Sequence, residues 1–350
     1  MKKLILKCIL LLGCTVFLVC TCTKNENKVT DGAENGNPIS AGETTENGVD
    51  EQPAPEGSIA ETNAGTTGVV YVNEAALYVE NEDGKMKWAK SAVLGDVATY
   101  LGEKKTASRT DGQKRDFFHI SIKGGDYWIQ DYCFEPNTEA AFISQPDTIL
   151  YKADSLTGAT DEMLPQYLIV AVYTDSLTAE NEKFVKIAAY SSDLLSWIVK
   201  GKFVKRENIE RNPNDVNAMM IAQIASQSKN DTIRSELFQN AIEMNSIYSN
   251  DIANIQALTE ARLKEDAFLA KLPVEKIEEK VVLNADTTLF SIPSTTDARI
   301  LETVKEGTKA VAYKKVSLDE GGKSVDWYYI ESKQKKGWVQ ASSLEIKETF

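Results

Sequence analysis

One feature limits the folds open to this chain more than any other: a pattern of short strands that occurs three times. Each time, a strand containing Leu is followed by an alternating strand, an aromatic strand and a closing Trp. The segments are rich in β-branched and aromatic residues and are bounded by Gly, Pro, Asp or Ser, which is typical of strands. A repeat of this kind indicates one supersecondary unit used several times. We therefore expect three similar β units.

The aligned segments match in residue type from unit to unit. The first strands are Ala76–Tyr78, Ile149–Tyr151 and Thr288–Phe290. The alternating strands are Val97–Tyr100, Ile169–Tyr173 and Ala310–Tyr313. The aromatic strands are Phe117–Ile120, Phe184–Ile187 and Trp327–Ile330, and the closing pairs are Trp128–Ile129, Trp197–Ile198 and Trp338–Val339. The separation from the first Leu to the closing Trp is nearly equal in the three units.

The pattern resembles the bacterial SH3 (SH3b) domain, in which a Gly before a strand, an aromatic strand and a Gly-Trp-Val element recur in this order. The third unit matches best, through Gly307, Trp327–Tyr328 and Gly337–Val339, and the second matches least. The resemblance implies small barrels whose ligands are cell-wall peptide or glycan, or a short protein segment. It also implies a candidate ligand groove, although the sequence does not show which aromatic side chains face outward. The candidate groove residues are Trp327, Tyr328, Tyr329 and Trp338.

The sequence predicts a mainly β chain with an α insert, made of three small SH3-like β-barrels and a three-helix segment. A lipoprotein signal peptide is expected at 1–21 and a disordered tether at 22–67, because the tether has almost no large apolar residue. SH3b-like domains are expected at 68–135, 139–205 (divergent) and 280–346, and the helical segment at 212–272.

The N-terminus has the pattern of an export signal, with two early lysines followed by the apolar segment Cys8–Val19. A Cys after such a segment, followed by polar sequence, resembles a bacterial lipoprotein signal, in which the Cys is acylated, for example with palmitate. We place the lipid on Cys22, with Cys20 as the alternative. An uncleaved anchor is the other interpretation, although Leu4–Val19 is short for a full membrane span. Both interpretations export the chain and attach it to a bacterial membrane, on its periplasmic or outer face.

Between the second and third units, the strand pattern gives way to helical periodicity. Asn212–Asp215 is a signal for the start of a first helix. Asp231 is the predicted N-cap of a second helix, and Ser249 or Asp251 that of a third. Pro273 is expected to end the third helix. We expect the apolar faces to pack on one another and on the flanking barrels. These faces are Val216, Met219, Met220, Ile224 and Ala225; Ile233, Leu237, Phe238, Ala241 and Ile242; and Ile252, Ile255, Leu258 and Leu263.

The sequence contains no catalytic constellation. The single histidine, His119, lies in a predicted strand and is expected at the surface, and Cys133, flanked by aromatic residues, is expected to be a buried thiol. No Gly-rich phosphate loop follows a strand, and no Cys/His cluster has metal-ligand spacing. We therefore expect no enzymatic activity, no cofactor and no metal.

The formal net charge is −13, which argues against nucleic acid as a partner, because phosphate binding requires clustered Lys and Arg. One segment, Glu103–Arg115, is locally basic. We interpret it as a solvated hairpin loop, with a docking site for an acidic partner as the alternative. Its cations are Lys104, Lys105, Arg109, Lys114 and Arg115.

These features together predict a non-enzymatic, lipid-anchored protein of the cell envelope. In the first hypothesis its barrels bind peptidoglycan or short peptide ligands. In the alternative, the protein is an envelope scaffold whose barrels are structural and whose helical segment recruits a protein partner. Exposed aromatic residues on the third barrel favour the first, and an open apolar groove on the helices favours the second.

Overall fold

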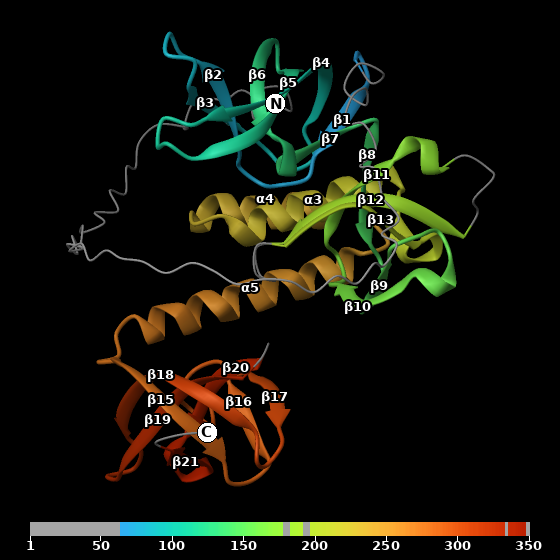
Figure 1. The fold of residues 1–350 in the computed structure, drawn as a ribbon. Coiled ribbons are helices and arrows are strands. Elements are labelled where there is room, and N and C mark those ends of the chain that lie inside the picture. The colour runs from blue at the N-terminus through green and yellow to red at the C-terminus, as the bar shows by residue number, and fades with distance from the viewer. Residues whose placement is uncertain (1–63, 178–182, 192–196, 333–334, 348–350) are drawn as a thin grey trace, which may run out of the picture. The chain divides into compact units, whose positions relative to one another are not determined.

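The computed structural model describes residues 64–177, 183–191, 197–332 and 335–347. The predicted signal peptide, with Cys20 and Cys22, and the tether up to residue 63 lie outside these residues. Within the described part, Figure 1 shows three antiparallel sheets and three α-helices. The fold is therefore mainly β with an α insert, as predicted.

Each repeat contributes seven strands to its own sheet. The first sheet has β1 (Thr67–Val70), β2 (Ala75–Glu80), β3 (Met86–Ala92), β4 (Val97–Ser108), β5 (Lys114–Ile122), β6 (Gly125–Gln130) and β7 (Phe134–Pro136). The second has β8 (Thr138–Ile143), β9 (Thr148–Tyr151), β10 (Ala159–Leu164), β11 (Ile169–Tyr173), β12 (Phe184–Ser191), β13 (Trp197–Lys205) and β14 (Ile209–Glu210). The third has β15 (Glu275–Leu283), β16 (Thr287–Phe290), β17 (Ile300–Val304), β18 (Lys309–Asp319), β19 (Ser324–Ser332), β20 (Lys335–Gln340) and β21 (Leu344–Lys347).

The three sheets have the same strand order. The orders are β3-β2-β6-β5-β4-β1-β7, β10-β9-β13-β12-β11-β8-β14 and β17-β16-β20-β19-β18-β15-β21. In each, a short 3₁₀ helix precedes the last strand, at Asp131–Cys133, Arg206–Asn208 and Ala341–Ser343. Three sheets with one order and one connection pattern fit an SH3b-like repeat.

Alternation along the strands gives each sheet an inner core. The Leu of each first strand, at positions 77, 150 and 289, is at most 1% exposed. Removing such a side chain beyond Cβ costs about 2–5 kcal/mol. The neighbours on either side of each Leu point to the opposite face, because side chains alternate along a strand. That opposite face carries a second layer of aromatic residues.

The closing residue of the second repeat differs from the prediction. In the first and third repeats, Trp128 and Trp338 lie opposite Tyr78 and Phe290 of the first strand. In the second repeat the residue opposite Tyr151 is Phe203, and Trp197 begins the same strand. The predicted closing residue of the second repeat, Trp197, was therefore wrong. Trp197 has nearly the expected spacing in the sequence, but Phe203 has the strand register of the other two closing residues.

The predicted alignment of the alternating strands matched Tyr100 with Tyr173 and Tyr313, which is one residue too far along the second and third repeats. Tyr100 lies opposite Ile120, and its register equivalents are Val172 and Ala312, opposite Ile187 and Ile330. Tyr100 is buried, whereas Tyr313 is 41% exposed. A shift of one residue moves a side chain to the other face of the sheet, so the shared Tyr at the strand end is not a shared core residue.

The helices are α3 (Pro213–Gln227), α4 (Asp231–Glu243) and α5 (Ser249–Leu269). The start of α3 is confirmed, with Asn212 as its N-cap. The cap of α4 is Asn230 rather than Asp231, and α5 begins at Ser249 after Tyr248, which makes no side-chain cap. Both Asn and Asp are good N-caps, so neighbouring polar residues leave the helix start uncertain by one position.

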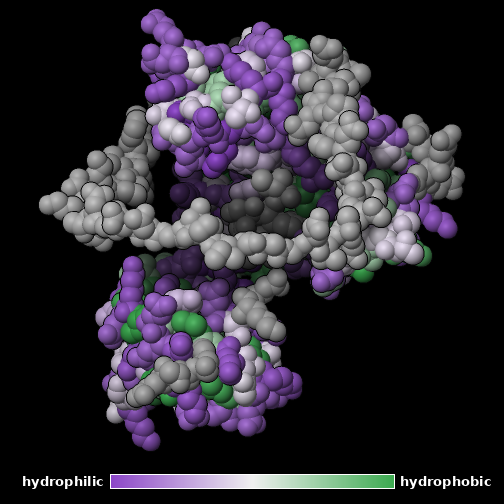
Figure 2. Space-filling model, in the orientation of Figure 1, coloured by the Kyte–Doolittle hydropathy of each residue, from purple (hydrophilic) through white to green (hydrophobic). Residues whose placement is uncertain are grey.

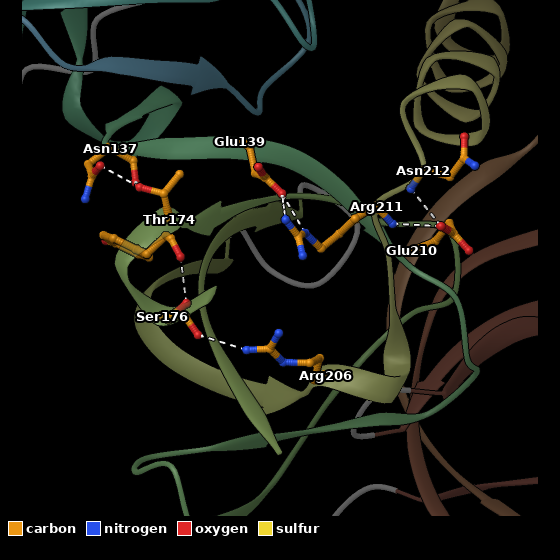
Figure 3. Close-up of polar contacts among 9 residues, drawn as sticks. Asn137, Glu139, Thr174, Ser176, Arg206, Glu210, Arg211 and Asn212 are labelled. Carbon is orange, nitrogen blue, oxygen red and sulfur yellow. Dashed lines mark hydrogen bonds and ion pairs between the residues drawn. The ribbon is translucent and has the colours of Figure 1, made fainter. Parts of the chain in front are cut away.

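Figure 3 shows how the second repeat leads into α3. Glu139 Oε1 accepts a hydrogen bond from Arg211 Nε at 2.5 Å. Glu210 Oε1 accepts from the backbone N–H groups of Arg211 and Asn212 at 2.9 and 2.8 Å. Asn212 Oδ1 then accepts from Asn214 N at 2.9 Å. These contacts fix the direction in which the chain enters the helix.

The helices share one apolar cluster with the first two repeats. Val216, Met219 and Phe238 pack with Leu94 of the first repeat and Phe142 of the second. The expected packing of α3 and α4 on each other and on the second barrel is therefore confirmed. Their cluster includes the first repeat, which was not expected, and no residue of the third. The expected face of α5 is buried only in part: Ile252 is fully buried, but Leu258 and Leu263 are 49% and 38% exposed.

Candidate functional site

The candidate site is built on one row of residues that crosses the third sheet. Neighbours in the row lie directly opposite one another on adjacent strands, so their side chains share a face. The row is Lys276, Lys314, Tyr329, Trp338 and Phe290, from β15, β18, β19, β20 and β16. It thus places two lysines beside three aromatic rings.

The four predicted groove residues do not occupy equivalent places. Tyr329 is half-buried and Trp338 is 2% exposed, and their rings meet edge to face at 5.6 Å between centroids. Trp327 is fully buried on the same face, and its Nε1 donates to Glu320 Oε1 at 3.0 Å. Tyr328 packs in the inner core of the sheet. Tyr328 therefore does not line an outer groove, because strand alternation points it inward.

The C-terminal end of α5 covers part of this row. Leu269, Leu272 and Val274 pack against a cluster that includes Trp327 and Trp338. The sequence reasoning missed this contact. The available signal was weak. It consisted of Leu269 at the end of the helix and Leu272 and Val274 just after it. The residues before Leu269 mix apolar and charged side chains without a clear apolar face.

One carboxylate joins α5 to the third sheet. Glu265 is 9% exposed, and it accepts hydrogen bonds from Arg299 Nε at 2.9 Å, Arg299 Nη2 at 2.7 Å and Ser291 Oγ at 2.7 Å. Burial alone raises the pKa of Glu265, but the hydrogen bonds from Arg299 and Ser291 and the guanidinium charge outweigh it, so the pKa lies below its ordinary value. The carboxylate is therefore charged at neutral pH.

A groove of about 750 Å³ lies between α5 and the row. Tyr329 and Trp338 line it, so two of the predicted groove residues do face a hollow, and five of its seven charged lining residues are cationic. We call it the basic groove. Its charged lining residues are Arg262, Glu265, Asp266, Lys276, Arg299, Lys314 and Lys336.

A second groove, of about 820 Å³, lies on the other side of the Glu265–Arg299 pair. Its lining shares Glu265, Leu272 and Arg299 with the basic groove. The rest of the lining has one further cation, Lys264, and several hydroxyl residues beside its apolar and acidic members. These members include Phe268, Ile292, Pro293, Leu318, Asp297, Asp319 and Glu320. The ion pair is thus a wall between two grooves of opposite charge.

The first repeat has an aromatic face at the equivalent place, and no residue of a described helix belongs to its apolar cluster. His119 stacks on Trp128 with ring centroids 4.5 Å apart, and the Lys105 ammonium lies 4.1 Å from the centre of the Trp128 ring. His119 is half-buried by this stacking, although strand alternation does place it on the outer face. At the edge of this face, Trp88 is 59% exposed.

The basic segment Glu103–Arg115 forms the ends of β4 and β5 and the turn between them. Lys104 lies within ion-pair distance of Asp116 and Asp131, Lys105 pairs with Glu80, and Arg109 pairs with Asp111. Most of its charge is therefore compensated within the hairpin and its neighbours, which agrees with the interpretation of a structural, solvated loop.

Cys133 is a free thiol and 2% exposed, so the expectation of a buried cysteine is confirmed. Burial raises the pKa of the thiol to about 12. A thiol with this pKa is a poor nucleophile at neutral pH, because the thiolate is the reactive form.

Two features are absent from the described residues. Among them, no three or more His, Cys, Asp or Glu side chains gather in a way that could hold a metal ion. None of the described helices has the length and apolar character needed to cross a membrane. Figure 2 shows hydrophilic side chains over most of the visible face, with hydrophobic ones in small separate areas.

Neither a protein-family model nor a curated protein matches this chain. Among solved structures, NlpC2 from Trichomonas vaginalis is similar at 13% identity, over 81% of this chain and 96% of that chain, with a TM-score of 0.17. A likeness at this TM-score assigns neither a fold nor a function. We therefore infer function from the residues themselves.

Proposed function

We propose that the chain is a non-enzymatic, lipid-anchored binding protein of the bacterial cell envelope, and that its third repeat binds cell-wall peptide or glycan. The observation that supports this most is the basic groove. In a chain of net charge −13, aromatic rings and cations are gathered at one concave site, with Tyr329 and Trp338 in its lining. Concave sites with a few convergent polar groups are the usual form of ligand sites.

The chemistry of this lining suits a wall polymer. Ring faces such as that of Tyr329 give apolar contact to sugar rings and aliphatic chains, while the phenol hydroxyl remains available for hydrogen bonding. The cations suit carboxylates, which peptide stems and lactyl groups carry. In the second repeat, Phe142 and Ile169 on the outer face of the sheet pack against α3 and α4. We assign binding to the third repeat because the basic groove lies there, and a supporting role to the other two.

The membrane anchor in this proposal depends on the leader. Cys22 is the residue we propose to carry the lipid, with Cys20 as the alternative. Mass spectrometry of the mature N-terminal peptide tests this part separately. A diacylated or triacylated Cys22 or Cys20 is the expected result, and an unmodified leader removes the lipid anchor from the proposal.

The alternative is an envelope scaffold in which the helical segment recruits a protein. The apolar faces of α3 and α4 give little support to the scaffold alternative, because residues of the first two repeats, such as Leu94 and Phe142, already pack against them. The exposed large apolar residues that remain on the α4–α5 connection and α5 are scattered, at Ile247, Leu258, Leu263 and Phe268. We therefore prefer the binding-module proposal.

The test is co-sedimentation of residues 23–350 with purified insoluble peptidoglycan. Tyr329→Ala removes a half-buried ring from the groove, and Tyr313→Ala removes an exposed ring that is outside it, so the second variant is the matched control. Circular dichroism and thermal melting confirm that both variants fold. We expect saturable binding that is weakened by Tyr329→Ala and unchanged by Tyr313→Ala. No saturable binding of the wild type contradicts the proposal.

A further inference from the structure

The basic groove contains a charge arrangement that folding alone does not account for. Lys276 and Lys314 lie directly opposite each other on β15 and β18, and like charges at opposite positions destabilise a sheet. Both side chains are exposed, and in the part of the chain that the structure describes neither forms an ion pair with a carboxylate. Lys314 instead lies over the Tyr329 ring, at 5.2 Å from its centroid.

Two further cations on the lining also form no ion pair with a carboxylate among the described residues. Lys336 lies two residues before Trp338 on β20, and Arg262 lies on the exposed side of α5. Lys336 lies opposite Glu331 on β19, but the two side chains form no ion pair. Asp266 lies on the same lining, but it pairs with none of these cations. The one engaged pair in the groove is Glu265 with Arg299, and it closes the groove at its shared wall.

We propose that these four cations bind the carboxylate groups of an extended, acidic peptide ligand. The proposal rests on the proposed function, since it names the chemical class that the basic groove recognises. Adjacent strands lie about 4.8 Å apart, so the row from Lys276 to Trp338 spans about 14 Å. Lys276 and Lys314 lie at one end of this row, and Lys336 lies two residues from Trp338 at the other end. Cations at both ends, with Tyr329 between them, fit carboxylates spaced along a peptide better than one compact phosphate.

The experiment uses residues 23–350 and three probes. The first is insoluble peptidoglycan, the second is the same material with its carboxyl groups converted to primary amides, and the third is soluble hexaglutamate, followed by tryptophan fluorescence. The double variant Lys276→Gln/Lys314→Gln removes the opposed pair. The control is Lys323→Gln, which removes an exposed charge of the third repeat that is outside the groove and forms no ion pair among the described residues.

We expect amidation to weaken wild-type binding about tenfold, the effect of losing one charge-assisted hydrogen bond. The double variant should bind native peptidoglycan about tenfold more weakly and should no longer distinguish it from the amidated form. Its melting temperature should stay equal or rise, because an unfavourable like-charge pair has been removed. The control variant should behave as the wild type does.

The outcomes separate the two proposals. If wild type and double variant bind native and amidated peptidoglycan alike, the carboxylate inference is wrong and the wall-binding proposal stands. Another outcome is that the wild type binds hexaglutamate but not peptidoglycan, and that the double variant no longer binds hexaglutamate. In that case the carboxylate site stands and the wall-binding proposal falls. If inorganic phosphate displaces hexaglutamate at equal charge concentration, a compact anion is the better ligand and the inference is wrong. If no probe is bound, both proposals fall.

Discussion

Glu265→Gln is the most informative single change for the α5 contact. The carboxylate accepts two hydrogen bonds from the Arg299 guanidinium and one from the Ser291 hydroxyl. A glutamine keeps one acceptor oxygen, loses the charge and turns an amide NH₂ toward a cation. Hydrogen bonds to charged groups contribute about 1.5–3 kcal/mol each. Because the Arg299 side chain is 32% exposed, water replaces part of the loss, and we expect a net cost of about 2 kcal/mol.

Hydrogen exchange at the C-terminal end of α5 measures this cost locally. A loss of about 2 kcal/mol raises the opening equilibrium about 30-fold, so amides between Glu265 and Leu269 should exchange about 30-fold faster. The matched control is Glu260→Gln on the same helix, where the exposed carboxylate accepts only from Gln256 Nε2. If Glu265→Gln changes the exchange no more than Glu260→Gln does, the ion pair does not hold α5 on the third repeat.

Two further predictions follow from shifted pKa values. The pKa of Glu265 is lower in the folded protein than the ordinary value of about 4.3, so its stabilising effect is complete above about pH 5 and is lost as the pH falls through the lowered pKa. The difference in corrected exchange rate between wild type and Glu265→Gln should therefore shrink as the pH falls below about 5 and disappear below the lowered pKa, and a constant difference contradicts the assignment. Cys133, with its pKa raised to about 12, should react with iodoacetamide at pH 8 far more slowly in the folded protein than in urea; equal rates show that the thiol is not buried.

The sequence predicted the repeat because its strands carry the same residue types at similar spacing. The aromatic strands were aligned in correct register: His119, Lys186 and Tyr329 each lie opposite the closing residue of their own repeat. The closing residue itself was misplaced in the second repeat, where Phe203 has the position expected of Trp197. Residue identity is a poor guide where a Phe and a Trp serve the same packing role.

The candidate site could be predicted only in part. Aromatic content pointed to the third repeat, and strand alternation explains why Tyr329 faces out while Tyr328 faces in. The contribution of α5 could not be predicted, because it depends on which surface of the third repeat the end of the helix meets. The opposed lysines could not be predicted either, since Lys276 and Lys314 are far apart in sequence and only the β15–β18 register brings them together.

The most direct test of the central claim uses the indole N–H signals of the five tryptophans, Trp88, Trp128, Trp197, Trp327 and Trp338. Residues 23–350, labelled with nitrogen-15, would be titrated with soluble peptidoglycan fragments and followed by NMR. We predict a saturable shift of the Trp338 signal, with Trp88 and Trp128 of the first repeat unchanged. A shift at Trp88 or Trp128 without one at Trp338 contradicts the assignment of binding to the third repeat, and no shift at any tryptophan contradicts wall binding at an aromatic groove.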